Sequence, residues 1–458
     1  MTELRKILQQ RFTERARFGS DDLAAYGGDW TRNFVVAPAA IVFPGSIEDV
    51  VDLVALARSH GFALVPSGGR TGLSGGAVAG NGEVVVSMAR MNRVLAFDAT
   101  DRLVRCEAGV ITAQLQEYAA SKGLFYPVDF ASSGSSQIGG NIATNAGGIK
   151  VIRYGLTRDW VAGLKVVTGA GEVLELNRGL VKNNTGYDFR HLFIGAEGTL
   201  GIVVEADIRL ARMPAAQVVL VVGVAKFADL LQVLAAFTAR IDLSAFEFFS
   251  ELALAKVIAG RGHPRPFAES APYYALLEMD EARMDVATEI FEACVTQGWI
   301  SDGVISQSVA QARALWRLRE DISESLSHFT PYKNDISVRI SRIPAFLAEA
   351  TALIHDAYPH FEVVWFGHIG DGNLHLNILK PGDLGIEEFF QRCGEVSLDL
   401  FAMIDRYGGS ISAEHGVGLL KKPYLQHSRS QAELALMRRL KRDFDPDNIM
   451  NPGKLIDA

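Results

Sequence analysis

The chain has 458 residues, of which 48% are hydrophobic and 21% charged, and its formal net charge is -8. This length predicts two or three domains with separate cores. The net negative charge argues against nucleic acid as a partner, because proteins that bind nucleic acid carry basic stripes. The three cysteines are too few and too scattered for a disulfide framework or for an ordinary iron–sulfur cluster, which takes four cysteines.

No segment of the chain predicts secretion or membrane insertion. The N-terminus is amphipathic and charged rather than an apolar signal core. The most apolar run, residues 218–225, is far too short to span a bilayer. We therefore expect a cytoplasmic protein without a transmembrane segment.

The first 213 residues predict short strands interrupted by helices. A leading helix precedes the first strand, and Ser46 is a candidate N-cap for a helix that ends at Gly61. A second helix is predicted over 111–121. Alternating or continuous apolar runs predict strands over 40–43, 62–65, 84–87, 94–97, 103–107, 160–168, 172–175 and 202–210.

A glycine-dense turn, Pro66–Ala77, follows the strand at 62–65. Glycines let backbone N–H groups point into one concavity that an anion can approach closely. Arg70 and the hydroxyl groups of Ser67, Thr71 and Ser74 favour a phosphate or pyrophosphate ligand. The spacing matches neither the Rossmann nor the Walker fingerprint. A plain surface loop that needs several positive-φ residues is the alternative.

Two further glycine-rich tracts follow, one over residues 132–148 and one over 182–201. The first is too rich in small residues to form core and too ordered in composition to be a flexible linker. The second contains Glu197, which could ligate a metal, although its glycine neighbours favour a structural role beside a cofactor.

The texture of the sequence changes near Met213-Pro214. Beyond it, strands at 218–224, 273–277 and 362–365 alternate with amphipathic helices, which predicts an α+β domain of antiparallel sheet with helices on one face. The helices are expected over 227–240, 281–297, 309–327 and 343–355.

The densest polar cluster is Phe366–Ile378, with a tight turn at Gly370–Gly372 between two strands. Alternation places His375 and Asn377 on one face, and the turn brings the strand bearing His368 beside them. Two such histidines could ligate a divalent metal through neutral imidazoles. A pair of hydrogen-bonded strand histidines is the alternative.

A second acidic–basic pair, Glu414-His415, lies between small residues in a glycine-lined turn. Such a pair suits a carboxylate ligand beside a general base, so Glu414 is a candidate third ligand.

Arg319 and Ser323 are one helical turn apart, and Lys333 follows on a strand predicted over 332–338. These groups would suit a substrate that carries a carboxylate. For Arg319, the residues alone favour a solvated helix face with Glu320 or Glu324 as its partner.

Taken together, these stretches resemble the FAD-dependent D-2-hydroxyacid dehydrogenases of the vanillyl-alcohol oxidase type, and among them the D-2-hydroxyglutarate branch. The motifs that carry the resemblance occur in the expected order and are Pro66–Ala77, Gln137–Gly148, Arg153–Gly155, Gly195–Gly201, Gly367–His375, Glu414–Gly416 and Asn451–Lys454.

The resemblance implies an α+β fold with a split FAD-binding domain, a substrate-capping domain of antiparallel sheet plus helices, and a C-terminal return. The expected bounds are 1–213, 214–410 and 411–458. The tracts contain no histidine where covalently flavinylated relatives attach FAD, so non-covalent FAD is expected. By this resemblance the FAD-binding residues are Pro66, Ser67, Gly68, Gly69, Arg70, Thr71, Gly72, Ser74, Gly75, Gly76, Ser133, Gly134, Gln137, Gly139, Gly140, Asn141, Thr144, Asn145, Gly147, Gly148, Tyr154, Gly155, Glu197, Gly201, Ile202 and Asn451.

The resemblance further implies that His368, His375 and Glu414 bind a divalent metal, zinc or manganese, and that His415 is the catalytic base. The metal would polarise the 2-hydroxyl group of the substrate while hydride moves to flavin N5. Arg319, Ser323, Lys333 and Asn377, with His415, would bind the substrate. Ser323 stands where a threonine is more usual.

A lysine at position 333 favours a dicarboxylate, because a second buried negative charge needs a second cation. D-2-hydroxyglutarate is therefore the expected substrate, with D-lactate, D-malate or glycolate as alternatives. A metal-independent flavin oxidase and a non-enzymatic FAD-binding module are the rival classes. Electrons would leave through a diffusible acceptor, such as an electron-transfer flavoprotein or a quinone-linked carrier, and a homodimer is compatible with the sequence.

Overall fold

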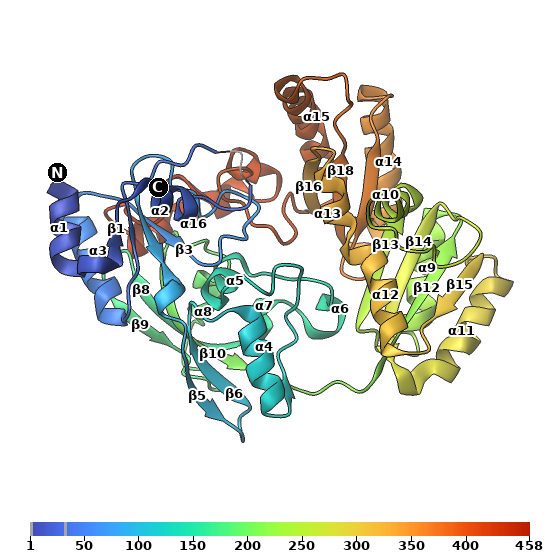
Figure 1. The fold of residues 1–458 in the computed structure, drawn as a ribbon, viewed down its shortest axis with the longest axis horizontal. Coiled ribbons are helices and arrows are strands. Elements are labelled where there is room, and N and C mark those ends of the chain that lie inside the picture. Colours follow the sequence, from blue (N-terminus) through green and yellow to red (C-terminus); the bar gives the residue numbers. More distant parts are fainter. Residues whose placement is uncertain (1–2, 32–33) are drawn as a thin grey trace. The chain divides into compact units, whose positions relative to one another are not determined.

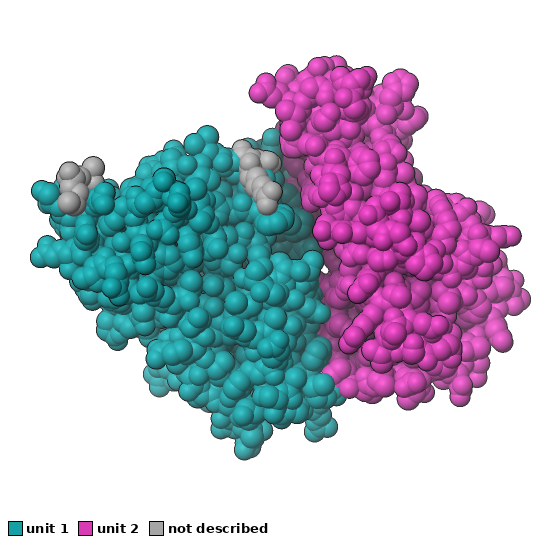
Figure 2. Space-filling model, viewed as in Figure 1, with its two compact units in different colours: residues 1–147, 155–213, 414–458 teal, residues 148–154, 214–413 magenta. Residues whose placement is uncertain are grey.

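A computed structural model describes residues 3–31 and 34–458 of the chain. Figure 1 shows its helices and strands, and Figure 2 colours its two compact units. Unit 1 contains residues 1–147, 155–213 and 414–458, and unit 2 contains residues 148–154 and 214–413. The chain thus leaves unit 1 after Met213 and returns to it at Glu414, with one short excursion at 148–154.

Unit 1 combines short helices with two main sheets. Its helices are α1 (Glu3–Phe12), α2 (Ser20–Tyr26), α3 (Ile47–His60), α4 (Thr112–Ser121), α5 (Ile138–Thr144), α7 (Thr157–Trp160), α8 (Arg190–Phe193) and α16 (Gln431–Phe444). Its strands are β1 (Ala16–Arg17), β2 (Ala40–Val42), β3 (Leu64–Ser67), β4 (Val84–Ser87), β5 (Val94–Asp98), β6 (Leu103–Glu107), β7 (Leu124–Phe125), β8 (Val161–Thr168), β9 (Val173–Leu176), β10 (Gly201–Arg209) and β11 (Ala211–Arg212).

The first sheet of unit 1 has the strand order β1-β2-β4-β3, and β4 pairs in parallel with both β2 and β3. All four residues of β4 are buried, as expected for a central parallel strand covered on both faces. Helix α3 is capped as predicted: the Ser46 side chain accepts from the Asp49 amide, and Gly61 ends the helix with φ 68°. β3 leads directly into the glycine turn, so the start of that turn belongs to the parallel sheet.

The second sheet is antiparallel, with the order β5-β6-β10-β8-β9. The C-terminal segment then completes unit 1, because the Leu64 amide donates to Ile449 O and the Asn451 amide donates to Leu64 O, both at 2.7 Å. Lys441 is buried beside this junction and donates to Thr199 O at 2.9 Å and to Met450 O at 2.6 Å. Residues almost 390 positions from β3 thus extend its edge.

Unit 2 is built on one seven-stranded antiparallel sheet with the order β15-β12-β14-β13-β17-β18-β16. Its strands are β12 (Gln217–Val224), β13 (Ala245–Ser250), β14 (Tyr273–Asp280), β15 (Asp302–Ile305), β16 (Tyr332–Ser337), β17 (Val363–Gly367) and β18 (Asn373–Ile378). Its helices are α6 (Val151–Tyr154), α9 (Phe227–Thr238), α10 (Glu251–Arg261), α11 (Met284–Thr296), α12 (Val309–Glu320), α13 (Ile322–Ser327), α14 (Ile343–Ala357) and α15 (Ile386–Arg406).

The expectation that helices cover one face of this sheet is wrong. Phe249 and Tyr274 pack in a core cluster with residues of α10, α12 and α13. The neighbouring residues Phe248 and Tyr273 point to the opposite face and contact Phe227 of α9. Both sheet faces are apolar, because β12, β13 and β14 are almost continuously buried runs rather than alternating ones.

Two other predictions also need correction. The helix expected over 309–327 is divided into α12 and α13 at Asp321. The tract at 132–148 does contribute to the core, because it contains α5 with Ile138 and Ile142 buried. Small residues let α5 approach closely: a Cβ atom at Gly139 would lie 2.7 Å from the Ala108 side chain.

Candidate functional site

The glycine turn (Pro66–Ala77) and the glycine-rich tract at 132–148 contact each other directly in unit 1. A Cβ atom at Gly69 would lie 2.1 Å from the carbonyl oxygen of Ser135, and one at Gly68 would lie 3.4 Å from the Gln137 side chain. The glycine-rich tract at 182–201 contacts the turn at another point, since a Cβ atom at Gly198 would lie 2.9 Å from the Pro66 side chain. The close contact between the two backbones therefore requires glycine at position 69. The turn and the unit 1 residues of the two tracts, 132–147 and 182–201, together form a glycine cradle.

The cradle contains buried polar atoms that suit a polar cofactor. Among the described residues, Ser67 Oγ, Gln137 Oε1 and Asn451 Oδ1 are buried and have no hydrogen-bond partner. A buried unsatisfied acceptor or hydroxyl group is costly, so a native protein usually supplies it with a ligand or water. The two amide oxygens can accept from sugar hydroxyl groups, and the Ser67 hydroxyl can donate to a phosphate oxygen, so these atoms fit the sugar and phosphate groups of FAD. Arg70 has φ 59°, and its guanidinium lies 4.3 Å from the centre of the Tyr26 ring.

Glu197 joins three separate segments of unit 1. Its carboxylate accepts from the amides of Val417 and Gly418 at 2.7 Å each, and its carbonyl oxygen accepts from Asn451 Nδ2 at 2.7 Å. Asn451 Nδ2 also donates to Gly76 O at 2.8 Å. Burial raises the pKa of Glu197 to about 7, although the two amide donors oppose that rise. Glu197 therefore fixes the turn that immediately follows Glu414-His415.

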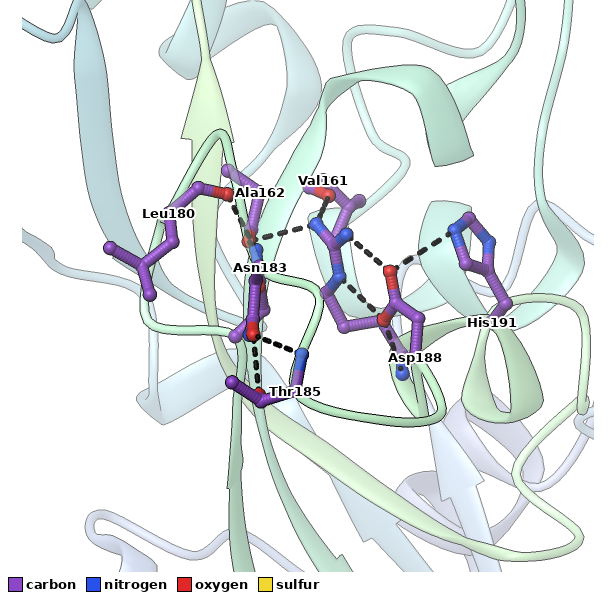
Figure 3. Close-up of polar contacts among 9 residues, drawn as sticks. Val161, Ala162, Leu180, Asn183, Thr185, Asp188 and His191 are labelled. Carbon is purple, nitrogen blue, oxygen red and sulfur yellow. Dashed lines mark hydrogen bonds and ion pairs between the residues drawn. The ribbon is translucent and has the colours of Figure 1, made fainter.

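The stretch before Glu197 is fastened to the start of β8 by side-chain hydrogen bonds (Figure 3). Arg190 Nη1 donates to Val161 O and Ala162 O at 2.8 Å each, and Arg190 Nε donates to Asp188 Oδ1 at 2.9 Å. Asn183 Oδ1 accepts from the Thr185 hydroxyl at 2.5 Å. The loop is thus internally braced before the chain enters α8 and the Glu197 turn.

Two residues expected at the cofactor belong to the other unit. Gly148 and Tyr154 lie in the 148–154 segment, which is part of unit 2. That segment is held there by ion pairs between Lys150 and Glu278 (2.5 Å) and between Arg153 and Asp280 (2.8 Å). The other residues expected to bind FAD lie in unit 1.

The predicted histidine hairpin is present in unit 2. Strands β17 and β18 pair with Phe366 opposite His375, and His368 follows directly after β17. The His368 and His375 rings are edge to face with centroids 5.2 Å apart, and both residues are buried. Burial raises the pKa of Asp371, in the hairpin turn, to about 6. The hairpin brings two imidazoles together without exposing them to bulk solvent.

Asp335 on β16 lies directly opposite His375, with Asp335 Oδ1 3.6 Å from His375 Nδ1. Asp335 accepts from Asn373 Nδ2 at 2.8 Å and from the Ala413 amide at 3.1 Å. Glu414 and His415 are the next two residues of the chain, so peptide geometry alone keeps them near Asp335. Asp335, His375, Glu414 and His415 thus form a candidate metal-binding group, with the nitrogen and oxygen donors that zinc and manganese accept.

The residues expected to bind substrate carboxylates differ in environment. Arg319 is buried and pairs with Glu247 at 2.8 Å, so its interpretation as an exposed helix residue is wrong. Glu324 instead pairs with Arg261. Ser323 is exposed on α13, beyond the break at Asp321. Lys333 lies directly opposite Asn377, one pair of same-face residues along β16 and β18 from Asp335 and His375.

Sequence reasoning missed Glu247, Asp335 and Asn373. Glu247 lies in β13, which was not predicted, as a single acidic residue among the aromatic residues of Ala245–Ser250. That pattern is itself a signal, because a charged group in a buried strand needs a partner. Asp335 is two residues from Lys333 on the same strand, so the two side chains share a face. The alternation of side chains along a strand could have indicated this.

Known proteins resemble this chain from residue 38 to residue 455. Residues 38–177 match the family described as "FAD binding domain", and residues 213–455 match "FAD linked oxidases, C-terminal domain". A "D-2-hydroxyglutarate dehydrogenase" of Stutzerimonas stutzeri (strain A1501) is 60% identical over 96% of this chain and 95% of its own length. One of Xanthomonas citri pv. viticola is 56% identical over 100% of this chain and 98% of its own length.

Solved structures of low sequence identity share the fold. A p-cresol methylhydroxylase with substrate bound matches with a TM-score of 0.79 at 17% identity, over 100% of this chain and 98% of its own. A 4-ethylphenol oxidase of Gulosibacter chungangensis matches with a TM-score of 0.77 at 18% identity, over 99% and 97%. Throughout residues 3–31 and 34–458, no helix has both the length and the apolar character needed to cross a membrane. The chain therefore belongs to the FAD-linked oxidases, in the same family as the D-2-hydroxyglutarate dehydrogenases that it matches.

Proposed function

We propose that this protein oxidises D-2-hydroxyglutarate to 2-oxoglutarate, with FAD as the electron acceptor and a divalent metal as the Lewis acid. The names of the two relatives that match over nearly their whole length support the substrate. The match to a FAD binding domain and the buried, unpaired polar atoms of the unit 1 cradle support the cofactor. The proposed FAD-binding residues are those that the sequence predicts.

The observation that carries the choice of substrate is the register of β16 against β18. Lys333 faces Asn377 one same-face pair away from Asp335 and His375, a separation of about 6.6 Å along a strand. A five-carbon dicarboxylate can span that step, with its C1 end at the histidines and its distal carboxylate at the lysine. Lys333 thus offers a cation where D-lactate would place nothing, since D-lactate has no second carboxylate.

The metal would be zinc or manganese held by His368, His375 and Glu414. His375 and Glu414 belong to the candidate group with Asp335 and His415, and His368 is added from the resemblance. His368 Nδ1 contacts Glu247, so this nitrogen is the donor and the lone pair is on Nε2. His375 and Glu414 would add a second neutral nitrogen and a carboxylate oxygen, the donor types of such centres. Asp335 keeps the hairpin, β16 and the 413–415 segment together through its bonds to Asn373 and Ala413.

When bound, FAD would supply the acceptor for the substrate Cα hydride, and the metal would supply a Lewis acid for the substrate 2-hydroxyl and C1 carboxylate. His415 accepts the hydroxyl proton as general base. Lys333 and Asn377 would bind the distal carboxylate, and Arg319 and Ser323 would also help to hold the carboxylates of the substrate. The electrons then pass to a diffusible acceptor, such as an electron-transfer flavoprotein or a quinone-linked carrier, in the cytoplasm.

Anaerobic bleaching of the flavin band at about 450 nm tests the reaction directly, because a reduced flavin loses this absorbance. We expect rapid bleaching by D-2-hydroxyglutarate, slow bleaching by D-lactate and L-2-hydroxyglutarate, and loss of bleaching after treatment with EDTA. Faster bleaching by D-lactate would contradict the substrate and keep the mechanism. Bleaching that survives EDTA would favour a metal-independent oxidase, and no bleaching at all would favour a non-enzymatic FAD-binding module.

His415→Asn tests the assignment of the base. The variant should retain FAD, because His415 is outside the glycine cradle, while the rate of bleaching falls by about a thousandfold, the range of general-base catalysis. Unchanged bleaching with bound FAD would remove His415 from the mechanism.

A further inference from the structure

We infer that Glu247 is a positioning residue that orients the proposed metal ligand His368 and the proposed substrate residue Arg319 from one buried carboxylate. The inference rests on the proposed function, because it gives Glu247 a role toward the metal. It concerns a residue of β13 that neither the sequence motifs nor the matches to known proteins single out.

Glu247 contacts both residues closely inside unit 2. Glu247 Oε1 lies 2.9 Å from His368 Nδ1, and Glu247 Oε2 lies 2.8 Å from Arg319 Nη2. The exposed fractions are 1% for Glu247, 6% for Arg319 and 7% for His368. A single ionised side chain thus holds two groups that approach it from the hairpin and from α12.

Strand pairing makes this contact a fixed feature of the sheet. β13 pairs with β17 through Phe248 opposite Gly367 and Phe249 opposite Phe366. Antiparallel order then brings Glu247 level with His368, the residue after β17. The neighbours of Glu247 in its strand are Phe246 and Phe248, so packing alone gives no reason for a carboxylate at this position. A buried carboxylate is tolerated where it is paired, and its two partners here are both residues with proposed roles.

The chemical consequence is the choice of tautomer at His368. A carboxylate at Nδ1 requires the proton there and leaves the lone pair on Nε2, and such an outer hydrogen bond also fixes the plane of the ring. On the other side, Arg319 is held between Glu247 and the Phe366 ring, with its guanidinium carbon 4.9 Å from the ring centre. Loss of Glu247 would therefore release the ring and the guanidinium together.

Glu278→Gln is a matched control for Glu247→Gln. Glu278 is on the neighbouring strand β14 and on the same sheet face, because it lies opposite Ala245, two residues from Glu247. It is also buried, and it bonds Lys150 Nζ at 2.5 Å and Trp316 Nε1 at 2.8 Å, away from the histidines. Both substitutions remove one buried charge from the same face, and only one of them touches His368.

The experiment measures the affinity of the FAD-loaded, metal-stripped full chain for Zn²⁺ by competition with a chromogenic chelator. We expect Glu247→Gln to weaken Zn²⁺ binding by about 10–100-fold, the range for a residue that orients a metal ligand. Glu278→Gln should remain within about 3-fold of wild type, because context-dependent effects of distant buried charges are small. The KM for D-2-hydroxyglutarate should rise in Glu247→Gln, because Arg319 is no longer held.

Wild-type Zn²⁺ affinity in Glu247→Gln, or an equal loss in both variants, would overturn the role of Glu247. If Glu247→Gln does not fold, Glu247→Asp serves instead, because it keeps the charge beside Arg319 and shortens the reach to His368 by one carbon. We expect about 10-fold weaker Zn²⁺ binding in Glu247→Asp, and an unchanged affinity overturns the inference. Failure of wild type to bind either Zn²⁺ or Mn²⁺ would instead contradict the proposed metal site, and this result needs no variant.

Discussion

The glycine cradle of unit 1 and the hairpin region of unit 2 are built in opposite ways. In the cradle, segments approach each other at positions where no further side chain fits, as Gly69 does against the Ser135 backbone and Gly198 against the Pro66 ring. In the hairpin region, buried charged and polar side chains hold each other in place, as Asn373 holds Asp335 and Glu247 holds His368.

This difference predicts how each region fails. Adding one carbon atom disrupts a site made of close backbone contacts, whereas removing one charge disrupts a site made of paired side chains. A variant in the cradle should lose FAD and keep the metal, and a variant in the hairpin region should lose the metal and keep FAD. The following variants test that separation, from the largest expected effect to the smallest.

Gly69→Ala should have the largest effect. Its Cβ atom would lie 2.1 Å from Ser135 O, so the two loops must separate at a cost of about 3 kcal/mol or more. We expect about 100-fold weaker FAD binding or its complete loss, measured by flavin fluorescence after gel filtration, with Zn²⁺ affinity retained. Gly394→Ala in helix α15 is the control, since a Cβ atom there meets nothing within 4 Å. Retention of FAD by Gly69→Ala would contradict the close-contact description.

Glu197→Gln tests a charge within the backbone-built region. Burial raises the pKa of the folded-state carboxyl from 4.5 to about 7, so the folded protein binds more protons than the unfolded chain between these values. Its contribution to the free energy of unfolding should fall by up to about 3 kcal/mol as the pH rises through that window. The difference in urea midpoint between Glu197→Gln and wild type, measured from pH 4.5 to pH 8, should follow this slope. Parallel pH profiles would show that Glu197 does not titrate in the window.

Asp335→Asn should weaken Zn²⁺ binding by about 10–100-fold and leave FAD bound, because the amide keeps the shape but loses the charge beside His375. Chelator competition and flavin fluorescence measure the two outcomes on one sample. Asp207→Asn is the control, since Asp207 is also buried but pairs with Arg105 in unit 1. An equal loss of Zn²⁺ affinity in both variants would mean that the loss comes from general destabilisation and not from the position of Asp335.

Lys333→Met should have the smallest effect and the most selective one. We expect the KM for D-2-hydroxyglutarate to rise about tenfold, the order of one charged hydrogen bond, while the KM for D-lactate stays unchanged. Steady-state kinetics with both substrates measure the ratio. An equal rise for both would place Lys333 at the C1 carboxylate, and no rise for either would place it away from the substrate.

Local signals in the sequence were enough for elements that depend on nearby residues. The Ser46 cap, the Gly61 end of α3 and the Gly370–Gly372 hairpin turn all arise from chemistry within a few positions, and the structure has them as predicted. The family motifs likewise indicated a FAD-dependent D-2-hydroxyacid dehydrogenase, which the comparisons support.

Contacts between distant residues were decided by the tertiary structure. Nothing near Glu247 in the chain indicates its pairing with His368, 121 residues away, or with Arg319 on a helix that local periodicity had extended past Asp321. The 148–154 segment and the Asn451–Leu64 bond likewise follow from long-range packing. By itself the sequence determined the turns, the caps and the residue types of the site, because these depend on local conformation. Only the fold determined which buried charges meet, because charge pairing depends on strand order and register, which no short stretch of sequence contains.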